Sequence, residues 1–307
     1  MTPLNLVFMG SPDFALPSLK ALHESPHTIR AVVSGSDKRR GRNQPPVPTP
    51  VRAYALEHGL PTIEADDVKS DAFRQQLAEL DADLFVVVAF KILPEPVLKL
   101  PKKGSVNLHA SLLPKYRGAA PIHHAIINGE TETGCTVFFL EKEVDTGDVI
   151  GVAKEPIGPN DTTGDLYERL KLSGAELLLH CVNDIAAGRA SAQPQRDEQS
   201  TAAPKLFAEN TRISFHQPAQ EVHNFIRGLS PFPGAWCTYN GKKATFYRSV
   251  VIQESDLAPG EPGISNGRLA IGCSTGAVGI LEVQLPGTKR LSGTDFVNGF
   301  DLDGRFE

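Results

Sequence analysis

The sequence predicts an α/β fold in which a Rossmann-like, mostly parallel sheet forms an N-terminal domain and a small β-barrel domain follows. Apolar runs with β character alternate with helical segments as far as residue 188, which is the rhythm of a parallel sheet. One of these runs, residues 83–88, is apolar almost throughout, as strands buried on both faces are. Beyond residue 206, short β-like runs separated by glycine turns replace the helices, which favours a small barrel.

Each element of the first domain has its own local signal. Pro17 stands at an early helical position, where its missing N–H is tolerated. Leu166, Leu170 and Leu177 recur at helical spacing and indicate a buried helix face, while Gly188 is a natural helix end. The predicted strands are residues 4–9, 29–33, 60–63, 83–88, 106–108, 134–140 and 149–153. The predicted helices are residues 17–24, 50–58, 71–80 and 163–187.

A change of composition predicts the domain boundary. Residues 190–204 are rich in Ala, Gln, Ser and Pro and show no apolar periodicity, which is typical of a linker. We therefore expect a first domain of residues 1–189, a linker of residues 190–205 and a second domain of residues 206–307. Asn240-Gly241 between two β-like runs is a strong hairpin signal. The second domain's β-like runs are residues 236–239, 244–247, 250–252, 268–271 and 278–283, with a helix expected at 221–228.

Composition excludes several classes of protein. The chain is 40% hydrophobic and 22% charged with a net charge of −5, which is ordinary for a soluble globular protein. No apolar run approaches the ~20 residues that cross a bilayer, and the N-terminus lacks a secretory signal, so we expect a cytoplasmic protein. The cysteines form no CxxC pair, so we expect reduced thiols and no metal site. Residues 10–14 lack the GxGxxG pattern of a dinucleotide site, which argues against an NAD enzyme.

Asn107, His109 and Asp145 are the candidate catalytic residues. An amide, an imidazole and a carboxylate can stabilise an oxyanion and move a proton, and none of them is an obvious nucleophile. This set suits direct transfer of an acyl group to an amine. Asn107 and His109 lie two apart at a predicted strand end, so they project to the same side, where ligands bind in open parallel sheets. The alternative is that both merely satisfy backbone groups at a strand exit.

Two separated segments carry a family resemblance. The run from Asn107 to Pro121 contains Asn-Leu-His-Ala-Ser-Leu-Leu-Pro, and residues 145–147 read Asp-Thr-Gly. Together these segments resemble the signature of the folate-dependent formyltransferase family. Residues 225–236, Phe-Ile-Arg-Gly-Leu-Ser-Pro-Phe-Pro-Gly-Ala-Trp, resemble the motif that opens the second domain in that family. The resemblance implies that this second domain is an OB-like barrel.

The resemblance also implies the reaction and its partners. It implies transfer of a formyl group from 10-formyltetrahydrofolate, as co-substrate, to the α-amine of methionyl-initiator-tRNA, by a monomer without a metal. The implied catalytic residues are Asn107, His109 and Asp145. The implied folate-binding residues are Phe14, Phe90, Lys91, Ile92, Leu93, Ser111, Leu112, Leu113 and Pro114. The implied tRNA-binding residues are Lys38, Arg39, Arg40 and Arg42. The sequence departs from the family pattern at Glu143-Val144, where Gly-Leu is frequent, and at Phe90-Lys91, where Tyr-Gly is frequent.

Other functions remain open at this stage. By charge pattern alone, the basic run within residues 35–50 is a solvated loop. A glycinamide ribonucleotide formyltransferase would share the catalytic set but has no use for the second domain. A formyltetrahydrofolate hydrolase or an amino-sugar N-formyltransferase has similar length and chemistry. A noncatalytic OB-type nucleic-acid-binding module is a fourth alternative, although residues 206–307 hold nine Lys and Arg against ten Asp and Glu.

Overall fold

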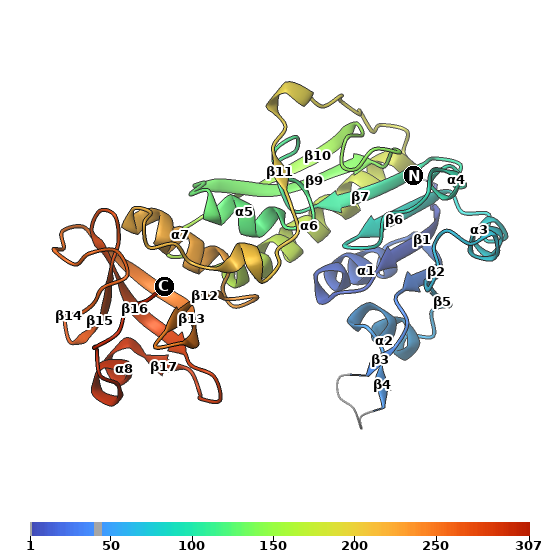
Figure 1. Cartoon of the computed structure of the whole chain (residues 1–307). Coiled ribbons are helices and arrows are strands. Elements are labelled where there is room, and N and C mark those ends of the chain that lie inside the picture. The colour runs from blue at the N-terminus through green and yellow to red at the C-terminus, as the bar shows by residue number, and fades with distance from the viewer. Residues whose placement is uncertain (1, 40–44) are drawn as a thin grey trace. The chain divides into compact units, whose positions relative to one another are not determined.

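The computed structural model describes residues 2–39 and 45–307, and Figure 1 shows the course of the chain. The chain forms two compact units. The first, here called the α/β unit, comprises Met1–Gly118, Gly134–Glu155 and Tyr167–Ala202. The second, here called the antiparallel unit, comprises Ala119–Thr133, Pro156–Leu166 and Ala203–Glu307. Within the described ranges, no helix is long and apolar enough to cross a membrane.

The α/β unit is built on one sheet with the strand order β10-β9-β7-β6-β1-β2-β5. Neighbours from β7 to β5 run parallel, whereas β9 runs antiparallel to β7, so the predicted mostly parallel sheet is confirmed. Its strands are β1 (Asn5–Gly10), β2 (Thr28–Ser34), β5 (Thr62–Glu64), β6 (Leu84–Val88), β7 (Ser105–His109), β9 (Glu132–Phe139) and β10 (Val149–Pro156). Because β1, β6 and β7 are parallel, the loops that follow them leave the sheet along one edge.

Helices cover this sheet, and their ends carry the expected local signals. The hydroxyl of Thr49 accepts from the Arg52 N–H before one helix, and Ser70 accepts from Phe73 before the next. The helices are α1 (Leu16–His23), α2 (Pro50–Glu57), α3 (Asp71–Ala78), α4 (Glu95–Leu98) and α6 (Thr163–Ala186), with the 3-10 turns η1 (Asp13–Ala15) and η2 (Asp197–Gln199). One apolar core lies between β1 and β6 on one side and α3 and α4 on the other, and it includes Val7, Val87 and Phe73.

The antiparallel unit has a sheet with the order β12-β13-β16-β15-β14, and β17 pairs with β16. Asn240 and Gly241 both have positive φ values, 48° and 70°, so the predicted hairpin turn is confirmed. The strands are β12 (Ala235–Tyr239), β13 (Lys242–Ile252), β14 (Pro262–Ser265), β15 (Arg268–Gly272), β16 (Ala277–Gln284) and β17 (Leu291–Ser292). The helices are α5 (Pro121–Ile127), α7 (Ala219–Gly228) and α8 (Gly293–Gly299), with the 3-10 turn η3 (Glu209–Thr211). Val222 and Ile226 of α7 belong to the core beneath this sheet.

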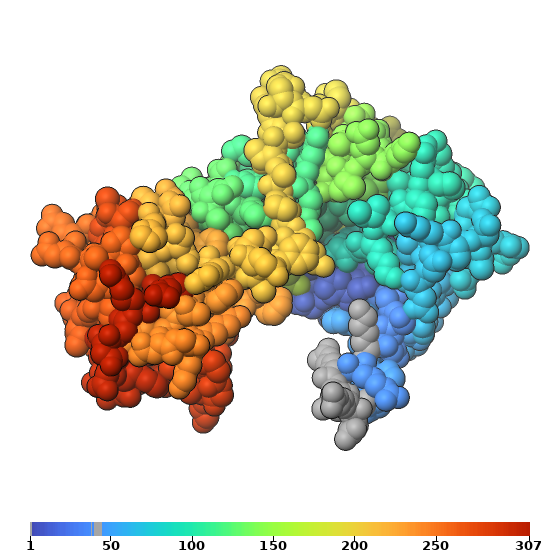
Figure 2. Space-filling view, viewed as in Figure 1, coloured from blue at the N-terminus to red at the C-terminus, as the bar shows by residue number. Residues whose placement is uncertain are grey.

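Some elements differ from the sequence prediction. The runs expected at 244–247 and 250–252 form the single strand β13, whose register shifts between residues 246 and 249 absorb the break in the pattern. Short pairs of residues also form strands: β3 (Lys38–Arg39), β4 (Pro46–Val47), β8 (Arg117–Gly118) and β11 (Ala202–Ala203). Residues 190–202 lie at the surface of the molecule, in the yellow part of Figure 2.

Candidate active site

Strand β7 positions Asn107 and His109. Asn107 is in register with Val87 of β6 on one side and Phe138 of β9 on the other, so its backbone is held from both sides. His109 ends the strand, is 7% exposed and packs its ring edge-on against Phe138, with 6.5 Å between ring centroids. Alternation along the strand places the two side chains on the same face. Among the described residues, none forms a hydrogen bond with the Asn107 amide, whose donor is therefore available to a substrate.

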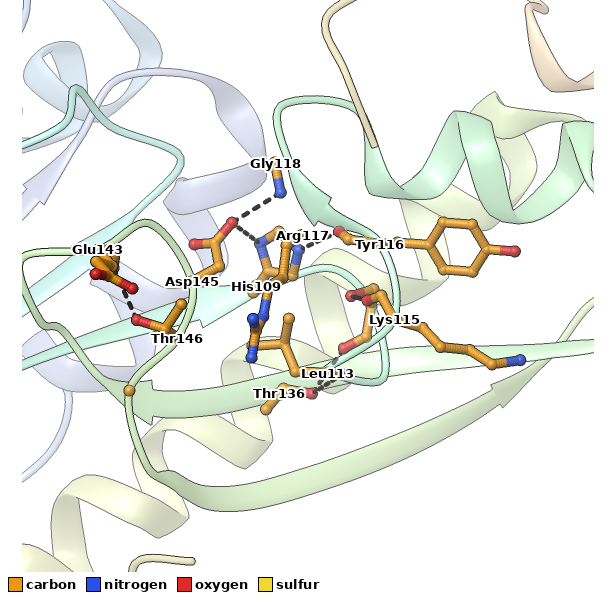
Figure 3. Close-up of polar contacts among 12 residues, drawn as sticks. His109, Leu113, Lys115, Tyr116, Arg117, Gly118, Thr136, Glu143, Asp145 and Thr146 are labelled. Carbon is orange, nitrogen blue, oxygen red and sulfur yellow. Dashed lines mark hydrogen bonds and ion pairs between the residues drawn. The ribbon is translucent and has the colours of Figure 1, made fainter. Parts of the chain in front are cut away.

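His109 and Asp145 form a buried pair (Figure 3). The His109 Nδ1 lies 3.7 Å from the Asp145 Oδ2, and the Nε2 lies 2.8 Å from the carbonyl oxygen of Tyr116. A carbonyl oxygen can only accept, so Nε2 carries a proton. A carboxylate likewise accepts, so a second proton on Nδ1 also faces an acceptor. Both ring nitrogens of His109 therefore face acceptor oxygens.

The turn that holds Asp145 has an unusual backbone. Asp145 itself has φ of 58°, in the left-handed region that few residues other than Gly adopt readily. Gly147 is required because a Cβ at this position would collide with the carbonyl oxygen of Phe139. The carboxylate Oδ2 accepts a hydrogen bond of 2.9 Å from the backbone N–H of Gly118. Within the described residues, Oδ1 has no partner, so it is the oxygen open to a substrate or water.

The loop after His109 is fixed by its own hydrogen bonds. Ser111 is fully buried, and its hydroxyl donates to the Lys115 carbonyl at 2.6 Å. Thr136 of β9 donates to the Ser111 carbonyl at 2.7 Å and accepts from the Leu113 N–H at 3.1 Å. Residues 112–114 are half-buried. The hydroxyl of Ser111 is thus committed to the shape of the loop, and the surface that the loop offers comes from residues 112–114.

The other residues predicted to bind folate follow strands β1 and β6. Phe14, just after β1, is buried with its ring 5.2 Å from that of Tyr167. After β6, Phe90 is half-buried, Ile92 is 72% exposed and Leu93 is buried. The Lys91 ammonium donates to the carbonyl of Asp66 at 3.1 Å and to that of Ala65. The Lys91 ammonium therefore stabilises the conformation of the loop after β6.

The predicted basic residues are only partly described. Lys38 and Arg39 form strand β3, which pairs antiparallel with β4, and Arg39 is exposed. Arg40 and Arg42 lie outside the described residues. Among the described residues, no group of three or more His, Cys, Asp or Glu side chains is arranged to hold a metal ion.

Sequence reasoning missed three groups that contact the candidate catalytic pair and a fourth that holds one of these three in place. Two are backbone groups, the Tyr116 carbonyl and the Gly118 N–H. The third is the side chain of Gln195, which donates to the carbonyl oxygens of Asp145 and Gly147. The fourth is Arg117, which donates to Gln195. Residue 195 lies in the segment predicted to be a linker, and nothing in the local sequence marks it.

An amide and a His–Asp pair at the carboxyl ends of parallel strands suit a group-transfer site. The chain belongs to the formyl transferase family: the formyl transferase model matches residues 4–182, and the model of the formyl transferase C-terminal domain matches residues 205–301. The two-part fold predicted from the sequence and the predicted family are confirmed.

Relatives that match nearly the whole chain show which kind of formyl transferase it resembles. The methionyl-tRNA formyltransferase of Chlorobium luteolum is 44% identical over 304 residues, which cover 97% of each chain. That of Moorella thermoacetica is 42% identical, again with 97% of each chain covered. Among solved structures, an N-formyltransferase from Helicobacter canadensis has a TM-score of 0.70 at 22% identity, with 90% of this chain and 99% of that chain covered. At that identity the likeness concerns the fold.

Proposed function

We propose that the chain transfers the formyl group of 10-formyltetrahydrofolate to the α-amine of methionyl-initiator-tRNA. The observation that carries this proposal is the 44% identity to a methionyl-tRNA formyltransferase over 97% of both chains, second domain included. The match to the formyl transferase C-terminal domain over residues 205–301 accompanies this identity. A reaction on charged tRNA would take place in the cytoplasm.

The chemistry follows from the three polar side chains of the site. The neutral amine attacks the formyl carbon, and the formyl oxygen becomes a tetrahedral oxyanion. The Asn107 amide, which has no partner among the described residues, donates to that oxygen. Preorganised donors of this kind are worth about 3–4 kcal/mol of barrier each. The bond from the formyl carbon to N10 then breaks, N10 takes a proton, and tetrahydrofolate and the N-formylated aminoacyl-tRNA are the products.

The His109–Asp145 pair handles the amine's proton. Nδ1 is the ring position that can gain a proton, because Nε2 already donates to the Tyr116 carbonyl. The Asp145 carboxylate, 3.7 Å from Nδ1, stabilises the ring while it is charged. The other carboxylate oxygen of Asp145 accepts from the Gly118 N–H, and Oδ1 orients the water through which the amine's proton reaches the ring. The proton then passes to N10 as the leaving group departs, so the site ends in its starting protonation state.

The folate is held by the loops after β1, β6 and β7. We assign the pterin contacts to Phe90 and Ile92, since the exposed Ile92 side chain offers apolar surface beside the site. Phe14 and Leu93 are buried and shape the wall behind these contacts. Lys91 keeps the loop in place through the carbonyls of residues 65 and 66. Leu112, Leu113 and Pro114 form the opposite side, and the buried Ser111 fixes the shape of their loop.

The tRNA is held by two separate surfaces. One is the basic run of Lys38, Arg39, Arg40 and Arg42, whose charges suit the phosphates of the acceptor end. The other is the outer face of residues 206–307, where Arg212 and Lys243 lie over the ring of Trp236 at 5.6 and 4.9 Å. Cations interleaved with an aromatic ring suit nucleic-acid backbone and bases. We therefore keep residues 1–189 as the catalytic domain, residues 190–205 as the connection and residues 206–307 as the tRNA-binding domain.

A competition experiment tests the function. Purified protein and 10-formyltetrahydrofolate are offered methionyl-initiator-tRNA, free methionine, a nucleotide-linked amino sugar and water as acceptors, and the formylated products are quantified. We expect formylation of the tRNA-linked amine with kcat/KM at least about a hundredfold above that for free methionine, because remote binding energy positions the reacting centre. Formate release as the main reaction would indicate a hydrolase, and formylation of the sugar would indicate an amino-sugar N-formyltransferase. Either result would refute the proposal.

A further inference from the structure

We propose that Gln195 is a positioning residue for Asp145 and His109, although it lies in the segment predicted to be a linker. Its amide nitrogen donates to the carbonyl of Asp145 at 3.0 Å and to that of Gly147 at 2.8 Å. Its amide oxygen accepts from Arg117 Nε at 3.2 Å and Nη2 at 2.7 Å. One side chain thus joins the two loops that carry the catalytic groups. The inference rests on the proposed function, because it takes Asp145 as catalytic.

The chemistry of these contacts fixes the orientation of the Gln195 amide. The carbonyl oxygens of Asp145 and Gly147 can only accept, and the Arg117 guanidinium can only donate. A rotated amide would place its NH₂ against the guanidinium and its oxygen against two carbonyls. No other side chain of this length offers two donors on one side and an acceptor on the other. The contact set is therefore specific for Gln.

Backbone hydrogen bonds near Gln195 hold its segment in place. Gln193 and Val149 exchange two backbone hydrogen bonds of 2.8 Å, which dock the segment on the start of β10, just beyond the Asp145 turn. Gln195 is half-buried, whereas its neighbours Pro194 and Arg196 are exposed. Within residues 190–202, only Ala190, Ala192 and Gln195 are half-buried, and the others are exposed.

Both ends of the contact act on the catalytic carboxylate. Asp145 has φ of 58°, and a carbonyl without a partner would let this strained turn relax. On the other side, Arg117 immediately precedes Gly118, whose N–H donates to the Asp145 carboxylate at 2.9 Å. Arg117 also donates to Asp197 at 2.8 Å, which fixes its guanidinium in the same segment. Losing Gln195 would free the turn and the N–H donor together.

Three variants test the inference in the full-length protein. Gln195→Ala should lower kcat by about tenfold to a hundredfold, as small displacements of a reacting group do, and leave the KM for the formyl donor within about twofold. Gln193→Ala is the matched control, because among the described residues its side chain forms a hydrogen bond only with the exposed Ser191. Its kcat should equal that of the unsubstituted protein. A Gln195→Ala protein with unchanged kcat would overturn the inference.

Gln195→Glu separates positioning from simple packing. A carboxylate keeps an acceptor for Arg117 but places negative charge against two carbonyl oxygens. We expect kcat near that of Gln195→Ala at pH 8. The ratio of its kcat to that of the unsubstituted protein should rise as the pH falls, because a protonated Glu regains one donor. A ratio that does not change with pH would contradict the positioning role. If Gln195→Ala proves unstable, this variant decides the question.

A readout that needs no activity distinguishes this inference from the proposed function. Amide hydrogen exchange is measured over peptides covering residues 115–119 and 143–149. We expect faster exchange in both peptides for Gln195→Ala and no change for Gln193→Ala. Unchanged exchange in both peptides would refute the role of Gln195 even if the enzyme is active. Faster exchange in Gln195→Ala, together with an unsubstituted protein that formylates no tRNA, would support the role of Gln195 and refute the proposed function.

Discussion

Two buried histidines, one in each compact unit, have similar partners on one ring nitrogen and different partners on the other. His109 Nε2 lies 2.8 Å from the Tyr116 carbonyl, and His223 Nε2 lies 3.1 Å from the Pro159 carbonyl. The Nδ1 of His109 faces the Asp145 carboxylate, whereas the Nδ1 of His223 lies 3.0 Å from the Ser249 hydroxyl.

The difference decides which hydrogen bonds each ring can form. A hydroxyl can donate, so a neutral His223 satisfies both ring nitrogens with Nε2–H and an accepting Nδ1. Burial lowers the pKa of His223, the charge of Arg227 lowers it further, and the bond to Pro159 opposes both. A carboxylate cannot donate, so Asp145 offers the His109 Nδ1 only an acceptor, whereas Ser249 can offer the His223 Nδ1 a donor. Burial alone therefore does not distinguish the roles of the two histidines, whereas the partner of Nδ1 does.

The largest expected effect is on turnover at the α/β site. His109→Ala should lower kcat by about a hundredfold or more, because it removes the group that carries the amine's proton. Asn107→Ala should have an effect of similar size through loss of the oxyanion donor. Rapid-quench measurement of formyl transfer under saturating substrates gives the chemical step. His223→Ala is the matched control, and a kcat in His109→Ala close to that of His223→Ala would remove the contrast between the two histidines.

A smaller effect is expected from the turn that carries the carboxylate. Gly147→Ala forces a Cβ onto the carbonyl of Phe139, so the turn must shift and carry Asp145 away from His109. A displacement of this kind lowers kcat by about tenfold to a hundredfold. Gly299→Ala is the control, because a Cβ there meets no atom within 4 Å. Melting temperatures show whether each variant folds, and a folded Gly147→Ala protein with full activity would dissociate the turn from catalysis.

The sheet was predictable because burial leaves a local mark on the sequence. Strands β1, β6 and β7 were found from apolar runs that both faces of a sheet require. Helices α5 and α8 were missed, being seven residues each, and α5 carries a His pair at 123 and 124 that weakens its apolar pattern. The capping box of Ser292 and Asp295 before α8 is a local signal for a helix start that apolar periodicity does not contain.

The site was predictable only in its side chains. Asn107 and His109 are two residues apart on one strand, and the Asp-Thr-Gly turn identifies Asp145. The prediction of the three side chains therefore rests on one strand and one turn. The Tyr116 carbonyl and the Gly118 N–H are backbone groups, so the residue types at these positions do not predict their hydrogen bonds. Gln195 reaches Asp145 across 50 residues of sequence, and only the folded chain brings them together. The catalytic and binding roles themselves stay predictions until turnover is measured.

The effect of replacing His223 should be on the stability of the protein, not on turnover. His223→Ala leaves the Ser249 hydroxyl and the Pro159 carbonyl without their partner and should destabilise the protein by about 1–3 kcal/mol at pH 7.5, with kcat unchanged. The folded-state pKa lies below the ordinary value of 6.5, so the stabilisation is complete above pH 6.5 and is lost as the pH falls toward the lowered pKa.

Urea midpoints at pH 7.5 and pH 5 measure this effect. The gap between the unsubstituted protein and His223→Ala should narrow at the lower pH. Burial also lowers the pKa of His123, but that residue is present in both proteins and its effect cancels in the difference. A gap that is constant with pH would show that His223 is not held neutral.

The smallest effect is expected at the basic run of the α/β unit. Its measurement tests whether this unit binds tRNA in addition to catalysing formyl transfer. Removing one cation by Arg39→Ala or Arg42→Ala should lower kcat/KM for methionyl-tRNA by several-fold and leave the affinity for folate unchanged, because one phosphate contact is lost. The salt dependence of kcat/KM should also become shallower, since each neutralised phosphate contributes a slope of about 0.7–0.9 in log–log form. Glu57→Ala, which removes an exposed anion at the end of α2, is the control for a general change of charge. Identical salt slopes in the Arg variants and the unsubstituted protein would make the run a solvated loop, and tRNA binding would then rest on the surface around Trp236.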